Sequence, residues 1–92
     1  MKSSSSHFLV KGKVQGVFFR ASAKEVADQM GLNGWVRNTI AGDVEIFVSG
    51  TDEQLDKFMC WCQTGPPRAK VDGIRVLPSL DEEDIAGFRI LR

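Results

Sequence analysis

Hydrophobic and polar residues alternate near the start of the chain, and the alternation predicts a strand. In residues 7–13, Phe8 and Val10 fall on one side of an extended backbone, whereas Lys11 and Lys13 fall on the other. Strict alternation of this kind is typical of a strand that buries one face and exposes the other. We therefore expect the fold to begin with a strand over residues 7–13.

A second spacing, in which apolar residues recur every third or fourth position, predicts a helix over residues 21–30. Gly31 follows the last apolar residue and is well placed to end the helix. Ser22 and Glu25 have the spacing of a capping box, which would start the helix about one turn later. Both starts remain open from the sequence. The apolar positions of this helix are Ala23, Val26, Ala27 and Met30.

The second predicted helix is marked at both ends. Thr51 and Gln54 have the spacing of a capping box at its start. Gly65 and the two prolines that follow it end the helical pattern. The apolar stripe of this helix consists of Leu55, Phe58, Met59 and Cys62.

The remaining runs of β-prone residues predict four more short strands. Residues 33–39 and 43–49 are joined by a turn that contains a glycine, which is typical of a hairpin. Residues 70–77 predict a strand whose alternation slips at Gly73, as at a β-bulge. Residues 88–91 are apolar enough for a final edge strand. The buried face of the second hairpin strand is predicted to consist of Val44, Ile46 and Val48.

The order of the main elements, β-α-β-β-α-β, predicts an α+β fold of the ferredoxin-like type, in which two helices cover one face of an antiparallel sheet. Because 92 residues supply apolar side chains for one core only, we expect residues 1–92 to form a single domain. The serine-rich residues 1–6 are expected to be disordered, and the acidic residues 81–84 are expected to form a solvated loop.

Composition limits the classes of function. Lys and Arg number 12 and Asp and Glu also number 12, so the chain has no net charge, and a broad basic surface for nucleic acid is not expected. An RNA-binding sheet would also need exposed aromatic residues on its central strands, where only Phe47 is available. No apolar run approaches the length of a signal or membrane-spanning segment. We therefore expect a cytoplasmic protein that binds neither nucleic acid nor membrane. We also expect a monomer, although the residues leave the oligomeric state open.

The two cysteines do not predict a metal or redox site. Cys60 and Cys62 are too close in sequence for an ordinary disulfide, and within a helix they point to different sides. His7 is the only histidine that could add a further soft ligand, so the ligand set of a zinc site is incomplete. We expect no metal ion and no cofactor, and a structural role for His7.

The candidate chemistry lies in residues 14–20, V-Q-G-V-F-F-R, which connect the first strand to the first helix. A glycine-containing turn before a helix can surround a phosphate with backbone N–H groups, together with the unpaired N–H groups of the first helical turn. Arg20 adds a planar, permanently charged guanidinium. One of the two adjacent phenylalanines is expected to turn into the core. The expected phosphate-binding residues are Gln15, Gly16, Val17, Phe18, Phe19 and Arg20.

The predicted topology brings a second polar residue to this loop. The first strand and the strand over residues 33–39 both finish at the same end of the sheet, because the intervening helix runs back in the opposite direction. Asn38 lies at the end of the second of these strands and is therefore expected beside Arg20. Its carboxamide can accept a hydrogen bond from a water and donate one as well.

Four segments of the chain resemble those of acylphosphatases in order and in spacing. They are V-K-G-K-V-Q-G-V-F-F-R at residues 10–20, G-W-V-R-N-T at 34–39, V-E at 44–45 and G-P-P-R-A at 65–69. The resemblance implies a small ferredoxin-like sandwich that hydrolyses a small-molecule acyl phosphate to carboxylate and inorganic phosphate. It also implies that Arg20 and Asn38 are the catalytic pair. Ala41 departs from the family pattern, because many members carry a polar residue at this turn position.

Two kinds of function are consistent with these residues. A carboxylic-phosphoric anhydride has a good leaving group, so a phosphoryl group held by the loop could be attacked directly by a water that Asn38 orients. The alternative is a non-catalytic phosphate-binding module, like the acylphosphatase-like domain at the start of some hydrogenase maturation factors, which would keep the same loop.

Overall fold

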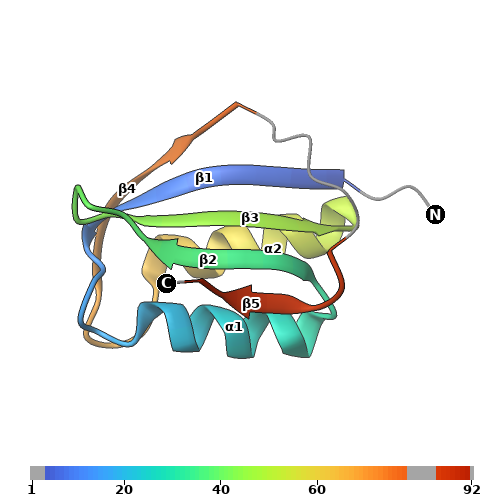
Figure 1. The fold of residues 1–92 in the computed structure, drawn as a ribbon, viewed down its shortest axis with the longest axis horizontal. Coiled ribbons are helices and arrows are strands. Elements are labelled where there is room, and N and C mark those ends of the chain that lie inside the picture. The colour runs from blue at the N-terminus through green and yellow to red at the C-terminus, as the bar shows by residue number, and fades with distance from the viewer. Residues whose placement is uncertain (1–3, 79–84, 92) are drawn as a thin grey trace.

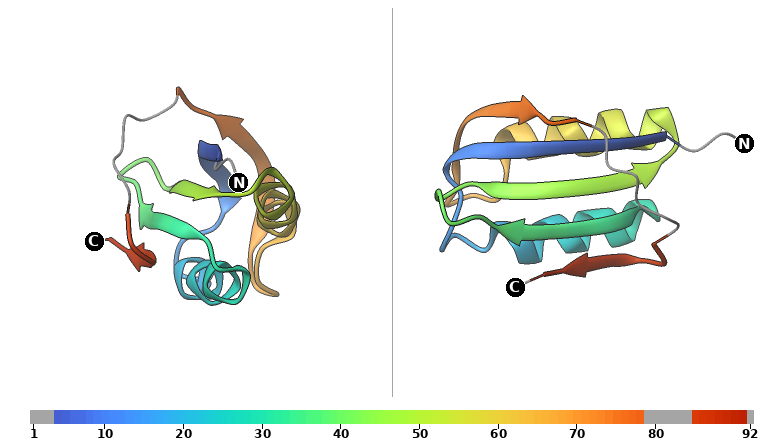
Figure 2. Two further views of the ribbon diagram at one scale, coloured as in Figure 1. Left: turned by 90° about the vertical axis from the view of Figure 1, so that its right-hand side faces the viewer. Right: turned by 45° about the horizontal axis from the view of Figure 1, so that its top comes forward.

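Five strands form a single sheet, and two helices pack against one of its faces (Figure 1, Figure 2). The computed structural model describes residues 4–78 and 85–91. The elements are β1 (Ser4–Lys13), α1 (Phe19–Met30), β2 (Asn33–Asn38), β3 (Val44–Gly50), α2 (Asp52–Thr64), β4 (Lys70–Val76) and β5 (Phe88–Ile90). The ferredoxin-like arrangement predicted from the order of elements is confirmed.

The sheet has the strand order β4-β1-β3-β2-β5, and its last pair departs from the prediction. The first four strands pair antiparallel, as expected, but β5 pairs parallel to β2. The prediction of an antiparallel sheet is therefore wrong for β5. The reason is directional. Because β4 runs opposite to β2, it finishes at the end of the sheet where β2 begins, and a strand that starts there and pairs with β2 runs the same way as β2.

The prediction of disorder over residues 1–6 is also wrong for Ser4, Ser5 and Ser6. These residues belong to β1 and pair with the last three residues of β3. Backbone N–H and C=O groups make a sheet ladder whatever the side chains are, so polar serines extend the strand as long as a partner strand is present. Residues 1–3 and the predicted acidic loop at residues 81–84 lie outside the described residues.

The core lies between the sheet and the two helices, and it is built from the predicted faces. Val44, Ile46 and Val48 are almost completely buried, as predicted for this strand. Each large apolar side chain buried in this way contributes about 1.5–3 kcal/mol to stability.

The two cysteines have different environments. Cys62 is buried on the apolar stripe of α2, and Cys60 is exposed. Burial raises the pKa of the Cys62 thiol.

The helix ends differ in how well the sequence predicted them. Helix α2 begins with the predicted capping box of Thr51 and Gln54. Helix α1 ends at Gly31 as predicted, but it begins at Phe19, earlier than either sequence signal indicated. The residue at the capping position, Phe18, makes no capping hydrogen bond with its side chain, and its backbone has a left-handed conformation. The start of α1 is therefore set by the preceding loop.

The β-bulge predicted at Gly73 lies one residue away. Gly73 is opposite Lys11 and Val71 is opposite Gly12, so Asp72 is the additional residue on β4.

None of the helices in residues 4–78 and 85–91 is long and apolar enough to cross a membrane.

Candidate active site

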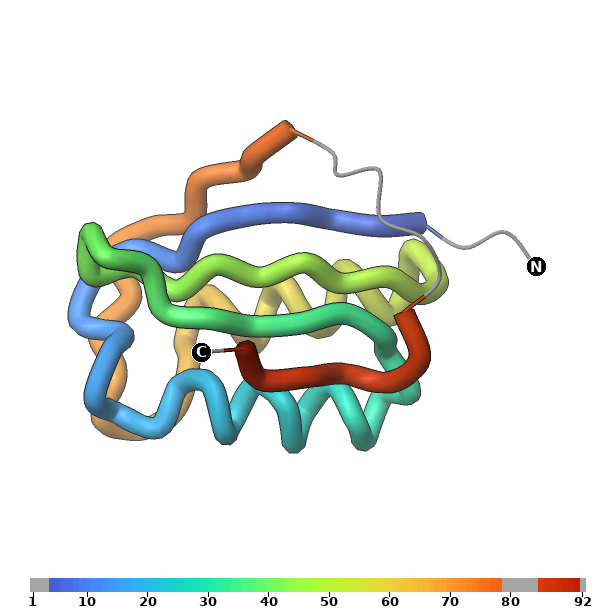
Figure 3. Tube along the Cα trace, viewed as in Figure 1, coloured from blue at the N-terminus to red at the C-terminus, as the bar shows by residue number. Residues whose placement is uncertain are grey.

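Two connections that are distant in sequence lie at the same end of the sheet. The loop at residues 14–18 joins β1 to α1, and the turn at residues 39–43 joins β2 to β3 (Figure 3). The two strands that lead into these connections, β1 and β2, point the same way because each is antiparallel to β3. This end of the sheet carries the residues singled out in the sequence.

The loop backbone has the sharp turns that an anion-binding cradle requires. Gly16 and Phe18 both adopt left-handed conformations, with φ of 73° and 65°. For a phenylalanine this conformation costs about 1–3 kcal/mol, which the neighbouring packing must offset. Val17 and Phe19 provide that packing, since both side chains are buried in the core. The loop is thus held by two apolar anchors while its backbone turns toward solvent and the start of α1.

The two phenylalanines have opposite environments. Phe19 is 1% exposed and packs against Trp61 with a ring-centroid distance of 5.4 Å, whereas Phe18 is 70% exposed. The prediction that one of them turns into the core is confirmed. Phe18 is left on the rim of the site.

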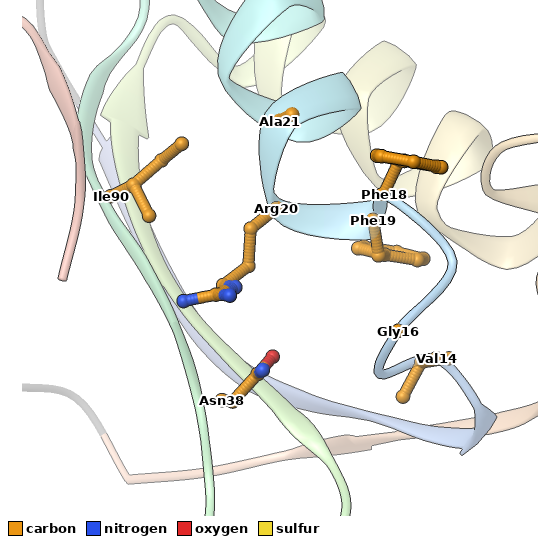
Figure 4. Close-up of a pocket in the computed structure, with 8 residues that line it drawn as sticks. All are labelled: Val14, Gly16, Phe18, Phe19, Arg20, Ala21, Asn38 and Ile90. Carbon is orange, nitrogen blue, oxygen red and sulfur yellow. The ribbon is translucent and has the colours of Figure 1, made fainter. Parts of the chain in front are cut away.

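Arg20 lies in the first turn of α1 and extends its side chain over the end of β2 (Figure 4). It is half-buried. Within the described part of the chain no carboxylate forms an ion pair with it. A guanidinium held at a helix N-terminus without a protein counter-ion is available to a bound anion.

Asn38 is the last residue of β2, and its side chain points toward the same space as Arg20 (Figure 4). Its Oδ1 atom is buried and has no hydrogen-bond partner among the described residues. Leaving a buried acceptor unsatisfied costs about 1–3 kcal/mol. The position is therefore suited to a water or to a ligand that donates a hydrogen bond.

Arg20 and Asn38 share a pocket of about 410 Å³. Its lining combines these two polar side chains with the loop backbone and several apolar groups: Val14, Gly16, Phe18, Phe19, Arg20, Ala21, Asn38 and Ile90. Of the six predicted phosphate-binding residues, four line the pocket, while Gln15 and Val17 do not. The side chain of Val17 is in the core, and that of Gln15 is directed to the β2–β3 turn.

Three lining residues, Val14, Ala21 and Ile90, were not among the predicted site residues, and of these only Ile90 lies far from the loop in sequence. It belongs to β5, opposite Val36 of β2, and it faces the pocket from the side away from Gly16 (Figure 4). A short apolar strand has no signal that assigns it to a site. Only the parallel pairing with β2 brings it there.

The open face of the sheet carries a separate charged cluster next to the site. Glu45 on β3 accepts hydrogen bonds from His7 Nε2 at 2.6 Å and from Arg37 Nε at 2.8 Å. Partial burial acts to raise the pKa of Glu45, but the hydrogen bonds from His7 and Arg37 outweigh it, so the pKa lies below its ordinary value. Arg37 also lies over the ring of Trp35, 5.9 Å from its centroid. Both His7 and Arg37 are thus engaged in structural contacts.

Comparisons with known proteins show the family to which the chain belongs. A family model described as Acylphosphatase matches residues 6–90. The acylphosphatase of Alkalilimnicola ehrlichii is 46% identical over 89 residues, which cover 97% of this chain and 99% of that protein. The chain in the crystal structure of acylphosphatase from Bacillus subtilis is 35% identical in sequence to this one. The two structures match with a TM-score of 0.90 over 99% of this chain and 100% of that one.

The same fold also occurs inside a much longer chain. The structure of T. kodakarensis HypF is 27% identical, with a TM-score of 0.83, over 99% of this chain but only 12% of that one. The family model and the relative from Alkalilimnicola ehrlichii both extend over nearly all of the sequence. The chain therefore belongs to the acylphosphatase family of hydrolases.

Proposed function

We propose that this protein hydrolyses the carboxyl-phosphate bond of acyl phosphates by direct attack of a water that Asn38 orients. The observation that carries the proposal is the shared pocket of Arg20 and Asn38, in which the Asn38 Oδ1 atom is buried and unpartnered among the described residues. The phosphoryl group is held by the loop backbone over residues 15–20 and by the guanidinium of Arg20.

The loop and Arg20 act by stabilising charge. In phosphoryl transfer the charge spreads over three equatorial oxygens in a loose transition state. The positive end of α1 and the backbone N–H groups of the loop face these oxygens, and the planar guanidinium can contact two of them together. Such groups cost no reorganisation at the moment of reaction because the fold already holds them.

Asn38 acts by positioning. Its Oδ1 accepts a hydrogen bond from the attacking water, and its Nδ2 can donate to a phosphoryl oxygen or to the water. The water oxygen forms a bond to phosphorus while the bond to the acyl oxygen breaks. The carboxylate leaves with that electron pair, and the proton lost by the water passes to a phosphoryl oxygen. A neutral carboxamide is sufficient because the carboxylate is a good leaving group.

The decisive experiment is an assay with benzoyl phosphate, in which the loss of substrate is followed at increasing concentrations of inorganic phosphate. We expect turnover, with phosphate as a competitive inhibitor because it is a product that occupies the same loop. Phosphate binding without any turnover would instead favour the alternative of a non-catalytic anion-binding module.

We further propose that the protein works as a monomer in the cytoplasm and binds no nucleic acid. Cys60 is a free exposed thiol and Cys62 a free buried one, which fits a reducing compartment. The absence of net charge weighs against a nucleic-acid footprint. Light scattering of the purified protein and fractionation of cells that express it would test the first two statements.

A further inference from the structure

The side chain of Gln15 joins the anion-binding loop to the turn that follows Asn38. Its Nε2 atom donates two hydrogen bonds, to the carbonyl oxygens of Thr39 and Asp43, each at 2.8 Å. Both N–H groups of the carboxamide are used in this way. The contacts are partly buried and connect segments 24 and 28 residues apart in sequence.

The two carbonyl groups already close the turn between β2 and β3. The Asp43 carbonyl accepts from the backbone N–H of Thr39 at 2.9 Å, and the Thr39 carbonyl accepts from that of Gly42 at 3.2 Å. A carbonyl oxygen has two lone pairs. Gln15 therefore hydrogen bonds to the second lone pair of each carbonyl oxygen. It holds a turn that is already closed by backbone hydrogen bonds.

The turn held by Gln15 begins at the residue after Asn38. Asn38 is the last residue of β2, opposite Val44, and Thr39 follows it directly. Beyond this point the turn extends into solvent, with Ile40 fully exposed. Apart from the sheet ladder, Gln15 and an ion pair from Lys11 to Asp43 at 3.0 Å hold the turn to the rest of the fold.

We infer that Gln15 is a positioning residue, which sets the distance between the phosphate held by the loop and the water held by Asn38. The inference rests on the proposed hydrolytic function. A displacement of about 1 Å between reacting groups can cost roughly a hundredfold in rate. The side chain of Gln15 touches neither substrate nor water and acts through Asn38.

Two substitutions separate this role from simple packing. Gln15→Met keeps the length and shape of the side chain but donates no hydrogen bond. Gln15→Glu places a carboxylate, which only accepts, against two carbonyl oxygens and should push the turn away. When the pH is lowered, the glutamate becomes protonated and can donate one hydrogen bond again. The turnover of Gln15→Glu relative to Gln15→Met should therefore rise as the pH falls.

The chain offers a matched control in Gln54. Its Nε2 also donates to a backbone carbonyl, that of Met30 at 2.7 Å, but it joins the start of α2 to the end of α1 at the opposite end of the sheet. Gln54→Met should reduce stability and leave turnover within about twofold of the wild type, because no reacting group depends on it.

The experiment measures turnover of benzoyl phosphate and the inhibition constant for inorganic phosphate in each variant. We expect Gln15→Met to lower turnover at least tenfold while the inhibition constant changes by less than threefold. In the double variant with Asn38→Ala, the loss should be no greater than for Asn38→Ala alone, because one residue acts through the other. Equal losses of turnover and of phosphate binding, or losses that multiply, would overturn the inference.

A readout without turnover keeps the inference testable if the hydrolytic function itself fails. Hydrogen exchange at the amides of Thr39 and Gly42 reports the closed turn directly. We expect exchange at least tenfold faster in Gln15→Met and unchanged in Gln54→Met. Unchanged exchange in Gln15→Met would show that this side chain does not hold the turn, whatever the wild-type protein hydrolyses.

Discussion

The role that we propose for Arg20 depends on the shape of its side chain as well as on its charge. It is half-buried at the start of α1, where a planar fork can contact two phosphoryl oxygens and a point charge cannot. We therefore expect Arg20→Lys to lose turnover almost as severely as Arg20→Ala, by about a hundredfold or more. Inhibition by phosphate should weaken in both variants. Phosphate inhibition that stays at the wild-type level in Arg20→Ala would remove Arg20 from the anion site.

Replacing Asn38 by alanine should lower turnover without weakening the binding of phosphate. We assign the buried Oδ1 atom of Asn38, which has no hydrogen-bond partner among the described residues, to the attacking water. Asn38→Ala should therefore lower turnover by about a hundredfold and leave phosphate affinity nearly unchanged. Asn38→Asp should be as inactive and should also bind phosphate more weakly, because a carboxylate repels the anion and cannot donate. Circular dichroism excludes unfolding. Near-normal turnover in folded Asn38→Ala would mean that another group orients the water.

At Gly34, where β2 pairs with β3, the backbone of β3 leaves no room for a side chain. The φ of Gly34 is 142°, and a Cβ atom there would lie 2.0 Å from the Phe47 carbonyl oxygen. Gly34→Ala should therefore lower the free energy of unfolding by about 3 kcal/mol or more. Gly42→Ala is the control, because its φ is also positive, 96°, but a Cβ atom there meets no atom of the described part of the chain within 4 Å. Denaturant unfolding of both variants measures the difference; equal losses would contradict the predicted clash.

The contacts of Glu45 join three strands and should make stability depend on pH. Its pKa is lowered from 4.5 in the folded protein because, despite partial burial, His7 and Arg37 hydrogen bond to the charged form. The stabilisation is therefore present above about pH 4.5 and is lost as the pH falls through the lower folded value. As the pH is lowered below 4.5, we expect the urea concentration at the unfolding midpoint to decrease in the wild type. In Glu45→Gln it should decrease less. Urea midpoints that decrease equally with pH in the two proteins would contradict this assignment.

At the scale of the whole molecule, the proposed chemistry needs only groups that the chain supplies. Charge stabilisation comes from the loop backbone and Arg20, and Cys60 is exposed on α2 and does not line the pocket. Turnover should therefore survive both a strong chelator and Cys60→Ser. A loss of more than about tenfold in the chelator, corresponding to ~1.4 kcal/mol, would count against this mechanism.

The parts of the fold that the sequence predicted are those whose signals are local. The Thr51 and Gln54 capping box, the stripe of α2 and the buried face of β3 each depend on residues a few positions apart, so their spacing is readable without the fold. The end of β2 at Asn38 and its position beside Arg20 were also accessible, because the direction of successive strands follows from the order of the elements. Whether these residues catalyse hydrolysis stays a prediction.

Other features depended on contacts between distant segments, and local spacing has no information about them. The start of α1 at Phe19 follows from burial of Val17 and Phe19, which overrode the local capping signal of Ser22. Which phenylalanine enters the core, and which stays on the rim of the site, was decided by the same packing.

The sequence by itself determined the set of elements, the loop at residues 14–20 and the pair of Arg20 and Asn38, because hydrophobic spacing and strand direction are properties of order along the chain. Only the tertiary structure decided that β5 runs parallel to β2 and brings Ile90 to the pocket, and that Gln15 binds the turn after Asn38. These contacts form because backbone groups and apolar surface must find partners wherever the folded chain presents them, and no pattern along the sequence records that choice.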